Sequence, residues 1–312
     1  FMIGPENKGL SSMFTMMNLE RIVVGIQGLG ISETAYQNAL AYAKERKQGK
    51  ANNSKNGEAD IIIKHADIRR SLMNMKSLIE GQRSLAFWVS QQIDVSLNHP
   101  DKKIKTNADE IVALMTPIIK SFFTDIGMEI TNDAIQVFGG YGYTKDQGIE
   151  QLFRDNRITP IYEGTNSVQA IDLVYRKILN NKIFEKYIAQ LSNEVKDFAK
   201  DNKLSLFADK FFKYLELLNN FTLWLGEKNK SSKDDVSAAC NDYLKVLGYI
   251  ALAHSWLKIL KVSHSKLKEN KTFYEDKINT AKYYFDKILP RVQSHYLSAI
   301  TGSDTMMKSN FN

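Results

Sequence analysis

The sequence predicts an all-α protein, in which an antiparallel four-helix bundle is followed by a second helical domain. Apolar residues recur at spacings of three and four through three long runs, which is the period of an amphipathic helix. Stretches rich in glycine, asparagine and serine separate these runs, and patterns typical of strands are nearly absent. The 312 residues, 43% of them hydrophobic, are enough to bury a sizeable core.

The first two runs have recognisable limits. We expect Asn18 to cap a helix that passes through "LERIVVGIQGLGISETAYQNALAYAKERKQGK". The segment "QGKANNSKNGEAD" then ends this helix with residues that favour turns. The second run extends from about Ile62 to Leu97 and ends at "NHPDKK".

The third run is expected to open at Thr106 or Asn107 and to end at "FGGYGYTKDQG". Short helices are expected after Gly148 and after Thr165. Three long runs that can pack antiparallel, with a fourth after Thr165, make a four-helix bundle the simplest architecture.

The chain changes character beyond Leu179, where lysine, asparagine and aromatic residues become frequent. The segment "GEKNKSSKDD" at 226–235 is expected to be a turn. We predict a domain boundary near "NNK" at 180–182, with the bundle in residues 11–180 and a helical extension in residues 181–312.

The net charge of +7 invites a nucleic-acid or membrane-surface interpretation. Residues 181–312 carry most of this excess, with 21 basic and 15 acidic residues, and Arg291 is their only arginine. Phosphate and base recognition favour arginine, whereas scattered lysines are typical of a solvated face. We therefore expect no nucleic-acid partner.

The cysteine and histidine residues indicate which compartment and which kinds of site the protein has. Cys240 is the only cysteine, which fits a reducing compartment and predicts a cytoplasmic protein. The histidines form no metal-binding motif, so no metal site is expected. No continuous apolar run reaches the length of a membrane span, so no integral span is expected either.

Glu163 is the strongest chemical candidate, because it lies in "TPIYEGT" between apolar residues and a glycine. Desolvation makes a carboxylate a stronger base, which would suit general-base catalysis. Thr165 can cap the following helix, whose free N–H groups suit polar ligand oxygens. The alternative is that Glu163 only favours the dipole at a helix start, and that "GGYGYT" is only a turn.

Three segments together resemble the C-terminal helical domain of the acyl-CoA dehydrogenase flavoproteins: "MNLERIVVG", "AYAKERKQGK" and "QVFGGYGYTKDQGIEQLFRDNRITPIYEGTNSVQ". The resemblance covers about residues 1–180. It implies that Glu163 is the catalytic base that removes the α-proton of an acyl-CoA thioester while the β-hydride passes to FAD. It also implies that the N–H of Glu163 donates to the thioester oxygen.

The resemblance implies two further groups of residues. The substrate-binding residues would be Arg21, Asn18, Tyr162 and Gly164. The FAD-binding residues would be Arg46, Gln136, Gly139, Gly140, Thr165 and Gln169, with the Gln136 segment meeting the flavin of a neighbouring subunit. A homo-oligomer and an electron-transferring flavoprotein as electron acceptor follow from the same resemblance.

The chain also departs from the usual family pattern. "ERKQGK" is one residue shorter than the common arginine motif and lacks its phenylalanine, and His65 stands where a glutamine is usual. "ERKQGK", "HADIRR" and the extension instead resemble a larger bacterial subgroup that includes the methylmercaptopropionyl-CoA dehydrogenases. Residues 1–10 would be the end of a β-domain, and the chain alone is expected to be inactive.

Three alternatives remain open. An acyl-CoA oxidase shares the motifs, a non-catalytic helical scaffold would share only the helices, and a membrane-surface module would use the lysine-rich C-terminal part.

Overall fold

The computed structural model describes residues 2–52, 57–180 and 183–311, and for Thr15 the backbone alone. The described residues form helices and no strand, with one isolated bridge between Lys47 and Ile61. The all-α prediction is confirmed. The predicted boundary at 180–182 falls mostly on residues outside the described ranges.

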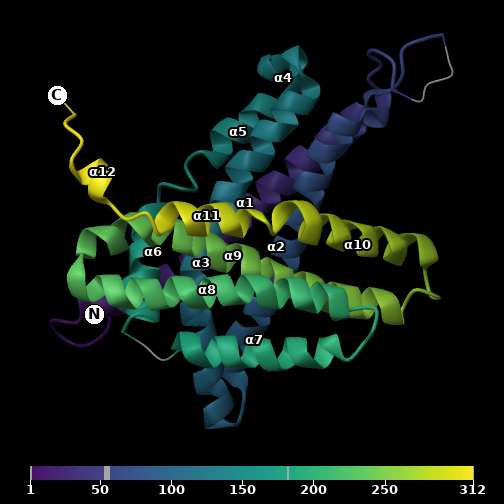
Figure 1. The fold of residues 1–312 in the computed structure, drawn as a ribbon. Coiled ribbons are helices and arrows are strands. Elements are labelled where there is room, and N and C mark those ends of the chain that lie inside the picture. Colours follow the sequence, from purple (N-terminus) through teal and green to yellow (C-terminus); the bar gives the residue numbers. More distant parts are fainter. Residues whose placement is uncertain (1, 53–56, 181–182, 312) are drawn as a thin grey trace.

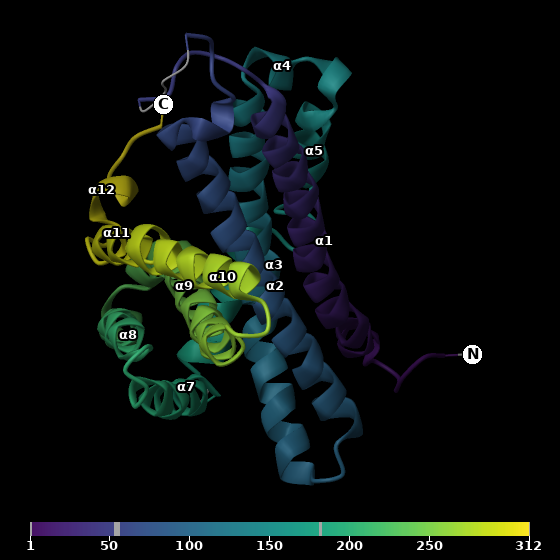
Figure 2. The same ribbon diagram turned by 90° about the vertical axis from the view of Figure 1, so that its right-hand side faces the viewer.

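Three long helices form the bundle: α1 (Gly9–Glu45), α2 (Ala66–Asn98) and α3 (Lys102–Phe138). They run up, down and up again, so neighbours in sequence are antiparallel (Figure 2). Small residues on α1 allow α3 to approach closely, since a Cβ at Gly25 would lie 2.5 Å from the side chain and backbone of Ile119.

Helix α3 is the central helix of the bundle. Its apolar stripe, which includes Leu114, Ile118, Phe122 and Ile126, is almost fully buried. Among the described helices, α3 alone is long and apolar enough to cross a membrane, and 78% of its most apolar stretch is buried inside the protein. A central bundle helix explains this composition.

Shorter elements follow α3. They are α4 (Gly140–Tyr143), η2 (Lys145–Gln147), α5 (Ile149–Asn156), α6 (Asn166–Asp172) and η3 (Leu173–Ile178). Helix α5 returns along α1 and α3, and α6 packs between α3 and the C-terminal helices (Figures 1 and 2). The segment between α5 and α6 contains Glu163.

The remaining helices pack across α2 and α3 on the side away from α1 (Figure 2). They are α7 (Ile183–Ala199), α8 (Ser205–Ser231), α9 (Lys233–Ser265), α10 (Lys271–Tyr283), η4 (Tyr284–Ile288), α11 (Arg291–Ala299) and α12 (Asp304–Met307). Helix α9 is the innermost of these, and its side chains join those of the bundle in one hydrophobic core. The short η1 (Ile62–Lys64) lies in the connection between α1 and α2.

Two close approaches connect α9 to the bundle. Trp256 donates its indole N–H to the carbonyl of Ser77 over 3.1 Å, beside Gly81, where a Cβ would lie 2.9 Å from the indole nitrogen. A Cβ at Gly248 would lie 2.6 Å from the ring of Phe122. Both glycines therefore permit packing that a side chain would prevent.

Several predicted helix limits are wrong. Asn18 is not an N-cap, because α1 begins at Gly9 and places Asn18 in its interior. Helix α3 begins at Lys102 rather than near Thr106, because the Asp101 side chain accepts hydrogen bonds from the N–H groups of Lys103 and Ile104. The expected turn at 226–235 is helical except at Ser232, whose hydroxyl caps α9.

Candidate active site

The segment between α5 and α6 is a series of tight turns. The N–H of Tyr162 donates to the carbonyl of Ile158 over 3.1 Å, and the N–H of Asn166 donates to the carbonyl of Pro160 over 3.0 Å. Thr165 then caps α6 by accepting from the N–H of Val168, as predicted. These bonds fix the backbone on both sides of Glu163.

Glu163 has a left-handed backbone, with φ of 57°. Its carbonyl accepts hydrogen bonds from Arg21 Nε at 3.4 Å and from Gln169 Nε2 at 3.2 Å. Gly164 follows with φ of 86°, and a Cβ there would lie 2.8 Å from Gln169 Nε2. A left-handed non-glycine residue costs about 1–3 kcal/mol, so the surrounding contacts must stabilise it.

Two polar atoms in this turn lack partners. Within the described part of the chain, the buried atoms Glu163 Oε2 and Gln169 Oε1 accept no hydrogen bond. The N–H of Glu163 likewise donates to none of the described residues. Unpaired buried polar atoms are costly, and a ligand that bonded to them would offset this cost.

The residues predicted to bind substrate differ in how closely they approach the Glu163 turn. Arg21 reaches the Glu163 carbonyl and lies 5.8 Å from the ring centroid of Phe14. Tyr162 is exposed, and its hydroxyl donates to Gln27 Oε1. Asn18 lies on α1 one turn before Arg21, exposed, and its side chain makes no hydrogen bond to a described residue. The structure therefore brings Arg21, Tyr162 and Gly164 together with Glu163.

A buried lysine lies beneath the turn and was not anticipated from the sequence. Lys120 is 0% exposed, and its Nζ donates to Asn166 Oδ1 over 2.8 Å. Burial lowers the pKa of Lys120 to about 8; the Asp125 carboxylate opposes this shift, Arg21 adds to it, and Glu163 opposes it. The sequence did contain a signal for this buried lysine, because Lys120 interrupts the apolar run "TPIIKSFF".

Asn166 connects this lysine to α3. Its Nδ2 donates to Asp125 Oδ1 over 2.7 Å and to the Ser121 carbonyl over 3.1 Å. Burial raises the pKa of Asp125, and the hydrogen bond from Asn166 opposes that rise. The start of α6, and with it the Glu163 turn, is thus attached to the central helix of the bundle.

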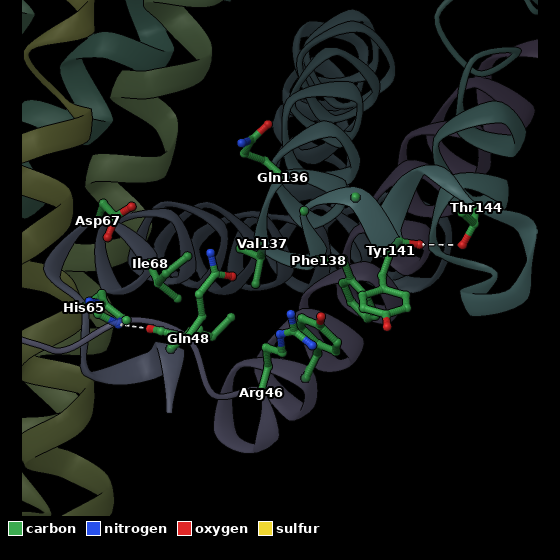
Figure 3. Close-up of a pocket in the computed structure, with 15 residues that line it drawn as sticks. Arg46, Gln48, His65, Asp67, Ile68, Gln136, Val137, Phe138, Tyr141 and Thr144 are labelled. Carbon is green, nitrogen blue, oxygen red and sulfur yellow. Dashed lines mark hydrogen bonds between the residues drawn. The ribbon is translucent and has the colours of Figure 1, made fainter. Parts of the chain in front are cut away.

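A second group of predicted residues lies at one end of the bundle, away from the Glu163 turn near its middle, around a cavity of about 680 Å³ that we call the upper cleft (Figure 3). It is lined by Tyr42, Arg46, Gln48, Gly49, Ile62, His65, Asp67, Ile68, Gln136, Val137, Phe138, Gly139, Gly140, Tyr141 and Thr144. Three chain segments meet here: the end of α1, the start of α2 and the end of α3 (Figures 2 and 3).

The upper cleft combines a cation with open backbone. The guanidinium of Arg46 is exposed and lies 5.4 Å from the ring centroid of Tyr141. Gly139 has φ of 62°, and a Cβ on Gly139 or Gly140 would meet nothing within 4 Å. The backbone at these glycines is therefore open to a ligand. His65 bonds the carbonyl of Gln48 over 2.8 Å at the edge of the cleft.

The two groups are far apart. Arg21 lies inside α1 and Arg46 is the C-cap of the same helix, and 25 residues at about 1.5 Å per residue separate them by about 38 Å. Thr165 and Gln169 belong with Glu163, whereas Arg46, Gln136, Gly139 and Gly140 belong with the upper cleft. The described chain thus carries two partial sites rather than one closed pocket.

An apolar stripe leads along α1 toward the Glu163 turn. Its members are exposed and recur at helical spacing: Leu10, Met13, Met16, Leu19, Val23 and Ile26. Ile158 and Ile161, next to the turn, are exposed as well. An exposed apolar surface of this kind marks a site of interaction.

Family models match both parts of the chain. Residues 7–179 match the acyl-CoA dehydrogenase C-terminal domain, and residues 191–310 match the acetyl-CoA dehydrogenase C-terminal-like domain. Because the first match covers more than half of the residues, the chain belongs to the acyl-CoA dehydrogenase family.

Individual proteins agree with this assignment. A 3-methylmercaptopropionyl-CoA dehydrogenase from Ruegeria pomeroyi is 39% identical over 181 residues, covering 58% of this chain and 31% of that protein. A butyryl-CoA dehydrogenase from Syntrophomonas wolfei is 30% identical over 307 residues, covering 92% of this chain and 48% of that protein. The chain therefore spans half or less of the length of these relatives.

The fold is also known from solved structures. Caenorhabditis elegans ACDH-11, solved in complex with C11-CoA, superimposes with a TM-score of 0.76 at 19% identity, covering 99% of this chain and 50% of that one. At this identity the likeness concerns the fold. It includes the C-terminal helices that pack across the bundle.

Proposed function

We propose that the chain is the C-terminal part of an FAD-dependent acyl-CoA dehydrogenase, in which Glu163 removes the α-proton of an acyl-CoA thioester. The observation that carries this proposal is the left-handed turn at Glu163, whose buried Oε2 atom has no partner in the described part of the chain. A structural glutamate at a helix start would not require this backbone, because a right-handed residue serves the helix dipole equally well.

The base requires help, because an α-proton of a thioester is far less acidic than a carboxylic acid. A donor to the thioester oxygen stabilises the charge that develops there. The N–H of Glu163 is suited to this task, since its own carbonyl is engaged by Arg21 and Gln169 while the N–H donates to no described residue. The left-handed turn thus presents the base and the donor from the same residue.

The residues present fit FAD in two places. In the upper cleft, Arg46 would pair with the pyrophosphate, while the open backbone of Gly139 and Gly140 would let the adenylate part approach. At the Glu163 turn, the Thr165 hydroxyl and Gln169 Oε1, which has no hydrogen-bond partner among the described residues, lie beside Glu163. When bound, FAD supplies the acceptor for the β-hydride.

The separation of the two partial sites supports a homo-oligomer. The two partial sites lie on different parts of the bundle and share no lining residue, so each complete site would combine the Glu163 turn of one subunit with the upper cleft of another. The apolar stripe on α1 would be covered by further protein that completes the acyl pocket. An electron-transferring flavoprotein is the proposed acceptor, and the cytoplasm the proposed location.

The first test is flavin retention. The purified chain is incubated with excess FAD, desalted and examined for visible flavin absorbance, and the same is done for the complete protein with its upstream domains. We expect the complete protein to retain flavin and Arg46→Ala to reduce the retention. Normal flavin retention by Arg46→Ala would remove this arginine from the proposed site.

The second test concerns the base. In the complete protein, Glu163→Gln keeps the size of the side chain but cannot accept the proton, so acyl-CoA turnover should fall at least about a hundredfold while flavin binding persists. Glu216→Gln, an exposed position on α8, serves as the matched control. Near-normal turnover by Glu163→Gln would exclude it as the base. Oxygen consumption in the same assay separates an oxidase from a dehydrogenase.

A further inference from the structure

A second cavity, of about 590 Å³, is lined by the first turns of α2 and by residues of α10, η4 and α11. Figure 2 shows these C-terminal helices crossing α2. We call it the basic cavity. It is lined by Ala66, Arg69, Arg70, Met73, Asn74, Tyr283, Lys287 and Arg291. We propose that this cavity binds a phosphate-bearing small molecule.

The charges around the basic cavity are not balanced. Four of its lining side chains are cationic, and three of them, Arg69, Arg70 and Lys287, form no ion pair with a described residue. Further along the same contact between α2 and α10 the charges do pair, as in Lys76 with Asp276 and Lys277 with Glu80. The unpaired cations are therefore a local feature and not a property of the whole interface.

Two carboxylates on α3, Glu129 and Asp133, interact with cations of the cavity and reduce its charge without cancelling it. Glu129 is engaged by Arg291, with Nη1 and Oε1 2.7 Å apart. Burial raises the pKa of Asp133, and Glu129 adds to that rise, while Arg70 and Arg291 oppose it. Against two such groups the cavity has four cations, so the net potential is positive.

The neutral side chains of the cavity also offer a donor. Asn74 is 8% exposed, and its Oδ1 accepts from the hydroxyl of Tyr283 over 2.7 Å. The amide nitrogen of Asn74, which also lines the cavity, donates to no described residue. A nearly buried amide donor among guanidinium and ammonium groups gives a site made almost entirely of donors, which suits an anion.

The size and the chemistry together define the ligand class. Planar guanidinium groups bind phosphate oxygens in pairs, and a volume of about 590 Å³ is in the range of sites for nucleotide-sized molecules. The basic cavity shares no lining residue with the upper cleft, so it is a separate site from the proposed FAD contacts.

The test is a calorimetric titration of the flavin-free chain at low salt, with inorganic pyrophosphate in one arm and ADP in the other. We expect one saturable site that weakens as salt is added. Arg70→Glu combined with Lys287→Glu should weaken binding at least about tenfold, and both side chains are exposed, so the fold should persist. Tighter binding of ADP would identify a nucleotide as the ligand, and tighter binding of pyrophosphate would identify a free phosphate compound.

Two controls locate the binding. Lys282→Glu makes the same charge change on α10, one residue before Tyr283 but outside the cavity, and should leave binding unchanged. Arg46→Glu should also leave it unchanged, since a loss there would place the phosphate in the upper cleft and overturn the proposal. Absence of saturable binding in both arms would overturn it as well. A third result would overturn the proposal too: the Arg70→Glu, Lys287→Glu variant changes its oligomeric state and no phosphate binding is found. The cations would then serve a contact between subunits.

Discussion

The Glu163 turn shows how much one backbone angle decides. A right-handed φ at Glu163 would reorient its N–H and its carbonyl. The carbonyl would then lose the hydrogen bonds that Arg21 and Gln169 donate to it. The sequence motif "YEGT" gave the identity of the proposed base, but it could not give this angle. Non-glycine residues rarely adopt it, so only the surrounding hydrogen bonds reveal it.

Gly164→Ala should therefore destabilise the chain by about 1–2 kcal/mol. A left-handed alanine is strained, and its Cβ would displace Gln169 from the Glu163 carbonyl. Urea unfolding of both proteins measures the change.

Gly226→Ala is the matched control for this experiment. Gly226 lies inside α8, has no positive φ, and a Cβ there would meet nothing within 4 Å. The same substitution should stabilise the chain by about 0.5–1 kcal/mol, because alanine favours helix. Equal effects of the two substitutions would contradict the argument from backbone angle.

At the scale of elements, the attachment of α6 to α3 depends on a lysine with an unusual environment. The pKa of Lys120 is about 8 in the folded chain and about 10.4 in an unfolded one. Between these values the unfolded state binds the extra proton, so the contribution of Lys120 to stability increases as pH rises from about 8 to 10. The full increase is on the order of 3 kcal/mol.

Comparison with Lys120→Met isolates this contribution. The free energy of unfolding of both proteins is measured by urea titration from pH 7 to 10, and the difference between them should move in favour of the wild type as pH rises. Burial raises the pKa of Cys240 to about 12. Cys240 and the buried tyrosines are present in both proteins, so their effects on the free energy of unfolding cancel in the difference. Parallel pH profiles would show that Lys120 keeps its ordinary proton affinity.

The contact between α9 and the bundle gives a second test at this scale. A Cβ at Gly248 would lie 2.6–2.9 Å from ring atoms of Phe122, which is itself 1% exposed and closely packed. Gly248→Ala should therefore destabilise the chain by about 1–3 kcal/mol, measured by thermal or urea unfolding. An unchanged or higher stability would mean that α9 can move away at little cost.

The sequence predicted helix type well and helix limits less well. The long runs before "FGGYGYT" have clear periodicity, and both limits of α2 and the end of α3 were predicted to within a few residues. The start of α1 was missed because Asn18 resembles a cap and Gly9 does not. The segment at 226–235 was predicted as a turn because glycine and serine favour turns, whereas burial of α8 against α9 keeps it helical.

Long-range proximity was the part that periodicity could not predict. Arg46 is distant from Gln136 in sequence, and only the antiparallel packing of α1, α2 and α3 brings both to the upper cleft. The basic cavity likewise combines Arg70 with Lys287, which lie in different predicted domains. The division into residues 11–180 and 181–312 stays a prediction, and the two parts share one hydrophobic core.

At the scale of the whole molecule, a site shared between subunits can be tested by complementation. In the complete protein, Glu163→Gln and Arg46→Glu should each be inactive, because each removes one half of every site. Mixed oligomers formed by joint refolding should regain about a quarter of the wild-type activity, since half of the random dimers contain one intact site. Activity that stays absent in the mixture would show that both residues act within one subunit.

Helix α1 carries Arg21 in its interior and ends at its C-cap, Arg46, beside the upper cleft, with no interruption between them. Each residue added to a helix rotates everything beyond it by about 100° and advances it by about 1.5 Å. A single insertion between positions 22 and 45 would thus turn Arg46 away from the upper cleft while leaving the Glu163 turn in place. Evolutionary changes of length in this chain should consequently be confined to the connections between helices, and α1 should keep a constant number of residues between its two arginines.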